Sequence, residues 1–165
     1  MDARRGSEPS PTKQVTVERT SDCELVVTRT FDAPARLVFE AWTRADLFQQ
    51  WWLPKSMDMK LESIEMDVRP GGQYRLGFGG GMEFFGRYLE VIPPVRLVWT
   101  NEESGDAGPV TTVTFEERDG KTLLVLRELY PSKEALDAAG TGASEVMPET
   151  FQQLDELLAR RPAGD

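Results

Sequence analysis

The sequence predicts an α+β domain in which a curved antiparallel β-sheet packs against a long helix at the C-terminal end. Extended segments rich in β-branched residues, separated by short turns, fill most of residues 59–130. Two short segments of helical periodicity precede them at residues 32–54, and a longer one follows at residues 144–158. Because an antiparallel sheet has one face to bury, the terminal amphipathic helix is its expected cover.

The length and composition fit one globular domain. The chain has 165 residues, of which 39% are hydrophobic and 28% are charged, a length typical of about one domain. We expect this domain at residues 15–160, between tails at residues 1–14 and 161–165 that carry no apolar run. No stretch has the ~18 apolar residues of a membrane span, and no signal-peptide pattern is present.

The first elements are an extended segment, either one strand or a hairpin, and two short helices, which lie between strands. Residues 15–31 are rich in β-branched side chains, and the polar residues 20–24 fit either a turn or a bulge between two halves. Asp32 is placed to cap the first helix, because its carboxylate can accept free backbone N–H groups. Thr43 is placed in the same way to cap the second helix, which Pro54 ends.

Six further strands form a meander joined by short turns. Asp119 and Gly120 both tolerate the positive φ of a type I′ turn, so this pair is the strongest hairpin signal in the chain. Consecutive strands joined in this way pair antiparallel. The expected strands are residues 59–67, 73–78, 83–92, 95–101, 110–117 and 121–130.

The C-terminal helix has one apolar face. A short helical segment at residues 131–139 precedes it, and Ser144 offers its N-cap. Pro148 fits only if the helix begins just before it. Because a straight helix cannot touch a strongly curved sheet along its whole length, we expect an apolar hollow between them, as in many ligand sites. The apolar positions are Met147, Phe151, Leu154 and Leu158.

Composition excludes several classes of function. The formal charge of -9 disfavours binding to nucleic acid or to a membrane surface. There is no histidine, which excludes Ser-His-Asp and Cys-His nucleophile sites, histidine-based metal sites and histidine general bases within this chain. The single cysteine, Cys23, forms no internal disulfide and fits a reducing cytoplasm. We therefore expect no cofactor, no metal and a cytoplasmic location.

Several ordered motifs resemble those of the homologues of the activator of heat-shock protein 90 ATPase. These proteins belong to the START/Bet v-type (SRPBCC) superfamily, which has the helix-grip fold. The resemblance covers nearly the whole chain, from residue 15 to residue 160. It differs at Glu149 and Thr150, where many members have a Gly-Trp pair. The motifs are TRTFDAPARLVFEAWT (28–43), WWLP (51–54), DVRPGGQYR (67–75), GRYLEVIPP (86–94), LVWT (97–100) and LDEL (154–157).

The resemblance implies an internal hydrophobic cavity and carries no fixed catalytic set. Adjacent strand residues point to opposite faces, so either Arg127 or Glu128 faces the helix. The family pattern places Leu124 and Leu126 inward, and with them Glu128 at the pocket, where desolvation would raise its pKa. In the alternative, Glu128 lies at the open end of the sheet and is solvated.

The other candidates for the pocket wall are aromatic or apolar. For the tyrosines and tryptophan on the strands, the alternative is a place at the exposed sheet edge with no role. We expect Trp42 to pack the two short helices against the sheet, whereas Trp51 and Trp52 fit either packing or ligand contact. The candidates, besides Glu128, are Tyr74, Tyr88, Trp99, Met147 and Phe151.

The resulting hypothesis is a protein that binds a small apolar molecule through burial of apolar ligand area. One alternative is an enzyme of the cyclase or hydrolase kind seen in the superfamily, with Glu128 or another carboxylate as acid or base. The other is a stress-response protein with a chaperone as its partner. The sequence determines neither the identity of the ligand nor the oligomeric state.

Overall fold

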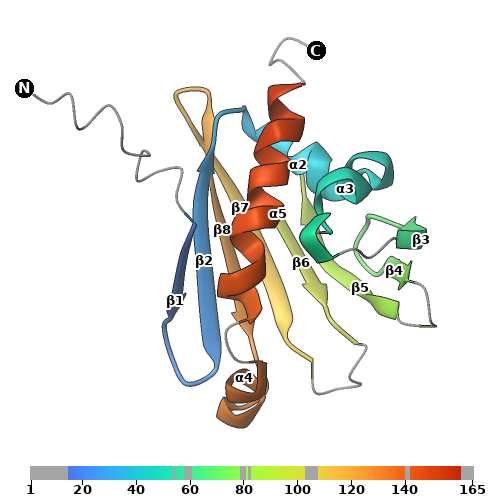
Figure 1. Ribbon diagram of the computed structural model, residues 1–165, viewed down its shortest axis with the longest axis vertical. Coiled ribbons are helices and arrows are strands. Elements are labelled where there is room, and N and C mark those ends of the chain that lie inside the picture. Colours follow the sequence, from blue (N-terminus) through green and yellow to red (C-terminus); the bar gives the residue numbers. More distant parts are fainter. Residues whose placement is uncertain are drawn as a thin grey trace, which may run out of the picture.

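The computed structural model describes residues 15–53, 55–57, 61–78, 81, 83–102, 108–139 and 142–160, with only the backbone of residues 57, 139 and 142–146 (Figure 1). The tails expected at residues 1–14 and 161–165 lie outside these ranges. The strands are β1 (Thr16–Arg19), β2 (Glu24–Phe31), β3 (Leu61–Met66), β4 (Gln73–Phe78), β5 (Glu83–Ile92), β6 (Arg96–Thr100), β7 (Val110–Arg118) and β8 (Lys121–Leu129). The helices are α2 (Ala35–Thr43), α3 (Ala45–Trp51), η2 (Lys55–Met57), α4 (Lys133–Ala139) and α5 (Gly142–Ala159).

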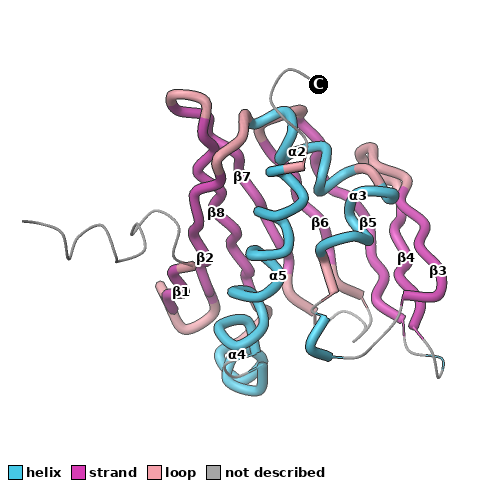
Figure 2. Tube along the Cα trace, turned by 45° about the horizontal axis from the view of Figure 1, so that its top comes forward, coloured by secondary structure: helices cyan, strands magenta, loops and turns pink. Residues whose placement is uncertain are grey.

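The strands form one antiparallel eight-stranded sheet in the order β1-β2-β8-β7-β6-β5-β4-β3. Strands β3 to β8 are the predicted meander, and β8 returns to pair with β2, as Figure 2 also shows. Asp119 and Gly120 have φ angles of 55° and 80°, which confirms the predicted turn between β7 and β8. Of the two alternatives for residues 15–31, the hairpin is present, because β1 and β2 pair antiparallel.

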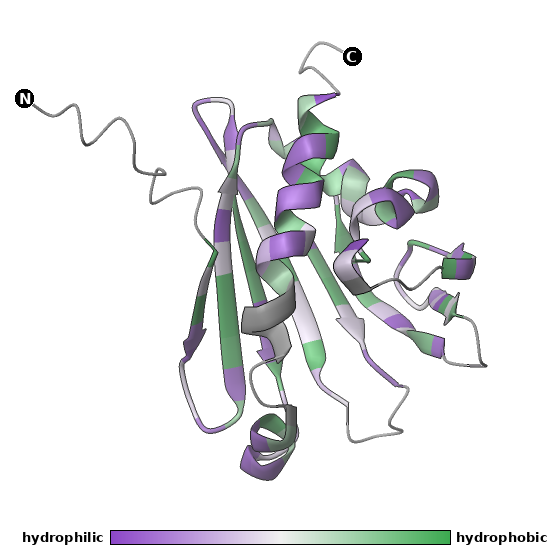
Figure 3. Cartoon of the chain, in the orientation of Figure 1, coloured by the Kyte–Doolittle hydropathy of each residue, from purple (hydrophilic) through white to green (hydrophobic). Residues whose placement is uncertain are grey.

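Helix α5 crosses one face of the sheet, and α2 and α3 pack beside it near the end of the sheet that holds the β7–β8 turn (Figure 1). In Figure 3 the strand residues beneath α5 are mostly hydrophobic, whereas the side of α5 away from the sheet carries hydrophilic residues. This is the α+β helix-grip architecture that the sequence predicts, and we call the sheet face under α5 the concave face.

Most inward side chains of the central strands form a dense core beneath α5. They lie in successive rows, because antiparallel partners face each other across the ladder. Burying them is the main favourable contribution to folding, at roughly 25 cal/mol per Å² of apolar area. We call these the packed rows, and their buried members are Val27, Arg29, Phe31, Leu97, Val113, Phe115, Thr122, Leu124 and Leu126.

Two predicted helix caps are wrong. The N-cap of α2 is Pro34, and no side chain caps it. The Ala35 N–H instead donates to Glu117 Oε1 of β7 at 2.9 Å, so a distant strand satisfies the helix end. Thr43 belongs to α2, and its hydroxyl donates to the carbonyl of Phe39 at 2.9 Å.

The predicted start of the last helix is also wrong. Helix α5 begins at Gly142, before Ser144, and Pro148 lies inside it. A proline within a helix removes one backbone hydrogen bond. The contacts of Phe151 and the following turns with the sheet exceed this cost, because they bury several large apolar side chains. A cap by the Ser144 side chain lies outside the described residues.

Candidate functional site

One row of the concave face differs from the packed rows because all four of its members in β5 to β8 carry a polar group. The ladder pairs Tyr88 with Trp99, Trp99 with Thr111 and Thr111 with Glu128, across strands β5 to β8. We call these four residues the polar row. They lie on the same face as Leu97, Val113 and Leu126 and follow them toward the end of the sheet away from the β7–β8 turn.

Glu128 is a partly buried carboxyl group with hydroxyl partners. The Tyr130 hydroxyl donates to Glu128 Oε1 at 3.1 Å, and the Thr111 hydroxyl also hydrogen-bonds to this carboxyl. Burial raises the pKa of Glu128, and the two hydroxyl hydrogen bonds oppose this effect. The predicted orientation of Glu128, on the face of Leu124 and Leu126, is present in the structure.

A hydrogen-bond chain fixes the direction of the Thr111 hydroxyl. The side-chain amide of Asn101 donates to Thr111 Oγ1 at 2.9 Å and to the Pro109 carbonyl at 2.8 Å. Since the Thr111 oxygen accepts from Asn101, its proton is directed to Glu128. Tyr74 supports the chain, because its hydroxyl donates to the Thr100 carbonyl at 2.7 Å and lies 3.4 Å from Asn101 Oδ1.

Aromatic rings surround this polar chain. The ring centroids of Tyr74 and Tyr88 are 5.8 Å apart. Burial raises the pKa of the Tyr88 hydroxyl. It also raises that of Tyr130, where the adjacent Glu128 carboxylate adds to the effect. Both phenols are therefore neutral at physiological pH and present neutral hydroxyl groups.

The predicted wall residues fall into two groups. Tyr88, Trp99 and Glu128 meet in the polar row, with Tyr74 beside them. Phe151 is only 1% exposed and packs edge-on against Phe31 of the packed rows, with ring centroids 5.5 Å apart. Met147, one turn earlier in α5, is partly buried against the core.

Sequence reasoning missed two polar members of the site. Thr111 has the same parity on its strand as the buried Val113 and Phe115, and this signal could have identified it. Asn101 follows β6 in a connection, so no periodicity marks it. The signal for Asn101 is three-dimensional, because its amide pairs with a residue on the next strand.

Trp42 packs the two short helices against the sheet, as predicted, and its indole N–H is buried without a hydrogen-bond partner. The residue is 5% exposed, and its ring lies 4.8 Å from that of Trp51 and 5.9 Å from that of Trp99. Trp51 is a packing residue whose Nε1 donates to the Ala41 carbonyl at 2.9 Å. Among the described residues, only Trp42 Nε1 is a buried side-chain polar atom without a hydrogen-bond partner. Such a group costs about 1–3 kcal/mol.

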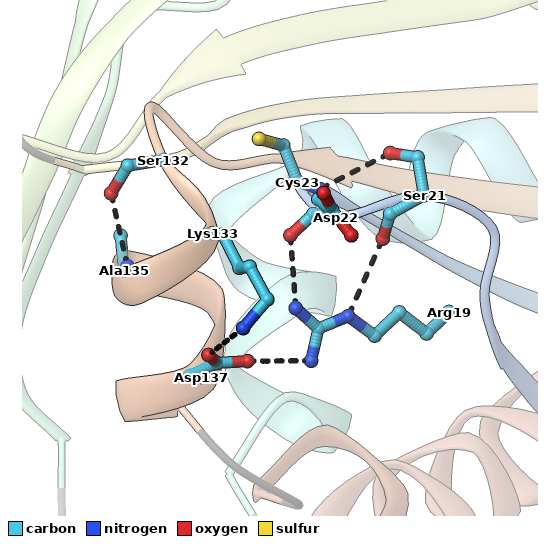
Figure 4. Close-up of polar contacts among 8 residues, drawn as sticks. All are labelled: Arg19, Ser21, Asp22, Cys23, Ser132, Lys133, Ala135 and Asp137. Atoms are coloured by element: carbon cyan, nitrogen blue, oxygen red, sulfur yellow. Dashed lines mark hydrogen bonds and ion pairs between the residues drawn. The ribbon is translucent and has the colours of Figure 1, made fainter.

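Helix α4 is tied to the β1–β2 turn by the polar contacts of Figure 4. Both lie at the end of the sheet opposite the β7–β8 turn (Figure 1). Arg19 pairs with Asp137 at 2.7 Å and donates to the Asp22 carbonyl at 3.0 Å. Lys133 also pairs with Asp137, and the hydrogen bonds from Lys133 and Arg19 lower the pKa of Asp137. Tyr130, which precedes α4, donates its backbone N–H to the Cys23 carbonyl at 2.8 Å.

Helix α5 is tied in a similar way to the segment that follows α3. The Gln153 amide donates to the carbonyls of Trp51 and Leu53 at 2.8 and 3.0 Å, and its oxygen accepts from the Lys55 N–H. One turn earlier, Glu149 accepts from the backbone N–H and the hydroxyl of Ser56. Glu149 therefore holds η2 against the helix.

An open depression of about 480 Å³ lies on the β3–β4 turn, where the backbones of Gly71 and Gly72 hydrogen-bond to that of Tyr88. Turn residues make up most of its lining, with Asp67, Arg69 and Gly72 among them. Asp67 and Arg69 pair with each other at 2.9 Å. The hollow expected between the curved sheet and α5 stays a prediction, because the α5 side chains of residues 142–146 lie outside the described residues.

Comparison with known proteins finds a family model that matches most of the chain. The family model described as "Activator of Hsp90 ATPase homolog 1-like protein" matches residues 32–159. No curated protein sequence matches at a significant level. None of the helices in the described part of the chain has the length and hydropathy that a membrane crossing requires.

Solved structures share the fold. A crystal structure of a protein from Rhodobacter sphaeroides is 23% identical, with a TM-score of 0.80 over 90% of this chain and 100% of that chain. A protein from Nitrosomonas europaea is 20% identical, with a TM-score of 0.77 over 88% and 99%. A solution structure from Staphylococcus epidermidis is 27% identical, with a TM-score of 0.70 over 89% and 95%.

Proposed function

Because the chain belongs to the activator of Hsp90 ATPase homolog 1-like family, we propose that it binds one small, largely apolar molecule on the concave face at the polar row. The observation that carries this proposal is the polar row itself. Each of its four members carries a polar group, whereas the packed rows are mostly apolar and have only Arg29 and Thr122 as buried polar members. Ligand sites typically combine apolar walls with a few polar groups placed to orient the ligand.

The unpartnered N–H of Trp42 supports the same location. It belongs to a ring next to Trp99 of the polar row. A ligand with a hydrogen-bond acceptor would relieve the cost of this group, because pairing a buried donor recovers its lost solvation. The reducing location expected from the single cysteine, the cytoplasm, is part of the proposal.

Native mass spectrometry of the protein purified from its own host tests the proposal. We expect a bound species that adds roughly a few hundred daltons, within the size range of ligands that such sites bury. Trp99→Ala should lose this species, whereas Leu129→Ala, at a position that is 54% exposed, should retain it. A protein that is always empty, or a ligand retained equally by both variants, would contradict the proposed site.

The raised pKa of Glu128 favours a second candidate, an enzyme in which Glu128 donates or accepts a proton. The ligand itself separates the two candidates. If Glu128 takes part in turnover, Glu128→Gln should retain a ligand whose mass differs from the one on the unsubstituted protein. Identical masses on both proteins would support binding without reaction.

The family name also raises a chaperone as a partner. This proposal has its own test, which is recovery of heat-shock protein 90 with the tagged chain from a lysate of the host. A purification that recovers no chaperone, under conditions in which the chain stays folded, would count against a chaperone role. It would leave small-molecule binding unaffected.

A further inference from the structure

Glu128 lacks a charge partner among the described residues. Its hydrogen bonds come from two neutral hydroxyl groups, those of Tyr130 and Thr111. The adjacent Arg127 is on the opposite face and pairs with Glu24 at 3.7 Å. The buried Arg29 lies two rows away and pairs with Asp155 of α5 at 3.8 Å. A partly buried carboxylate without a counter-charge is costly, and a ligand can supply that charge.

The hydrogen bonds around Glu128 fit an ionised carboxylate that accepts hydrogen bonds rather than a carboxylic acid that donates one. Because Asn101 donates to Thr111, the Thr111 proton is directed toward the carboxyl group, and Tyr130 donates to it as well. Two donors stabilise the ionised form. The aromatic rings of Trp99 and Tyr130 occupy the same face, and such rings attract organic cations. The net charge of -9 favours the approach of a cation.

We propose that the ligand is an amphiphilic amine whose protonated nitrogen binds Glu128 and whose apolar body lies toward Trp99. This inference rests on the proposed function and names its ligand class. Trp99 and Glu128 are separated by one strand, β7, so their backbones lie about 10 Å apart. This distance fits an ammonium group joined by one carbon to a naphthalene-sized ring.

Two matched probes test the inference, and their dissociation constants are measured by isothermal titration calorimetry. Naphthylmethylamine is a cation at neutral pH, and naphthylmethanol is its neutral counterpart of nearly the same shape. We expect the amine to bind about tenfold more tightly, as for a charge-assisted hydrogen bond in a partly buried site. Glu128→Gln should abolish this preference and leave binding of the alcohol unchanged. Glu116→Gln, which alters an exposed carboxyl of β7, should retain it.

The pH dependence gives a measurement on the unsubstituted protein. Glu128 faces Thr111 of β7 and Leu25 of β2, Tyr130 lies just after its own strand, and the polar row continues to Tyr88 of β5. Both tyrosines stay neutral in the acidic range, because burial raises their pKa values. As pH falls through the raised pKa of Glu128, amine binding should weaken while alcohol binding stays constant.

The outcomes separate the two levels of the proposal. Equal binding of amine and alcohol overturns the amine inference and leaves the proposed function standing. Absence of binding by both probes, with the unsubstituted chain folded, overturns the inference and counts against the proposed site. A preference for the amine that survives in Glu128→Gln also overturns it, because the charge would then be received elsewhere.

Discussion

Arg29 and Glu128 are both ionisable groups on the concave face, and the fold treats them differently. Arg29 lies in the packed rows, where Asp155 and the Phe151 carbonyl of α5 contact its guanidinium, and its charge lies 4.6 Å from the Phe31 ring centroid. Glu128 has only hydroxyl partners among the described residues. The charge of Arg29 is compensated by Asp155, whereas under the proposal a bound amine compensates the charge of Glu128.

The difference separates a structural charge from a functional one. Burial lowers the pKa of Arg29, and the charges of Asp155 and Asp32 oppose that effect. Its partners lie on α5, so Arg29 helps to fix the helix on the sheet. For Glu128, no opposite charge within the described ranges reduces the effect of burial on its pKa. Substitutions of Arg29 and of Glu128 should therefore change the free energy of unfolding in opposite directions.

The largest expected effect is on Phe151, at the centre of the packed region. Phe151→Ala removes a ring that contacts Phe31, Trp42 and Trp51, and should lower the free energy of unfolding by about 3–5 kcal/mol. Chemical denaturation measures this change. Leu129→Ala, at an exposed position, should change it by less than about 1 kcal/mol. Equal effects of the two substitutions would show that the α5 interface is not the core described here.

The next effect concerns the compensated charge. Arg29→Met should cost about 2–3 kcal/mol, below the usual cost of breaking a buried ion pair, because the Asp155 side chain is 25% exposed and regains water. Adding Asp155→Asn to this variant should recover part of the loss. If Arg29→Met is neutral, the helix is not held by this pair.

Glu128 should behave in the opposite way. At about pH 7, Glu128→Gln should leave the free energy of unfolding unchanged or raise it by up to about 1 kcal/mol, because it removes a desolvated charge. Denaturation of both proteins between about pH 4 and pH 7 measures this. A clear loss of stability at neutral pH would show that the carboxylate has a cation within the chain.

The pH dependence of this difference has a defined sign. Well below the ordinary carboxyl pKa of 4.5, the folded and unfolded chains both hold the proton, and Glu128 imposes no penalty. As pH rises, the unfolded chain releases the proton first, so the stability of the unsubstituted protein falls until the folded-state pKa is passed. The advantage of Glu128→Gln should therefore grow as pH rises, and a constant difference would contradict the raised pKa.

The smallest effect is that of one hydroxyl group. Tyr130→Phe removes a donor to the Glu128 carboxylate and should raise the pKa of Glu128 further, as measured by NMR titration of its side-chain carboxyl carbon. Tyr88→Phe, in the same row but across two intervening strands, serves as the control and should leave this pKa unchanged. Equal shifts in the two variants would exclude a specific role for Tyr130.

Much of the fold follows from local sequence signals. Alternation identified the strands, and the Asp119-Gly120 turn fixed the register of the last hairpin. Alternation placed Glu128 on the same face as Leu124 and Leu126, and the family resemblance, not the alternation, indicated that this face is the inward one. These features depend on neighbours in sequence, which a single chain displays directly.

The features that could not be predicted depend on contacts between distant segments. The α2 helix end is satisfied by Glu117 from β7, not by Asp32, and the Pro148 position is tolerated because α5 packs on the sheet. The pairing of Asn101 with Thr111 likewise needs two strands to meet. Glu149, which departs from the family pattern, acts through Ser56, on a segment far away in sequence.

The central claim is that the polar row, and not the packed rows, receives a small molecule. Titration of isotopically labelled protein with naphthylmethanol, followed by NMR, tests it most directly. We expect the saturable shifts to be largest at Tyr88, Trp99, Thr111 and Glu128, and small at Val27 and Leu124 of the packed rows. Shifts that are largest on the outer face of the sheet, or that never saturate, would contradict the account.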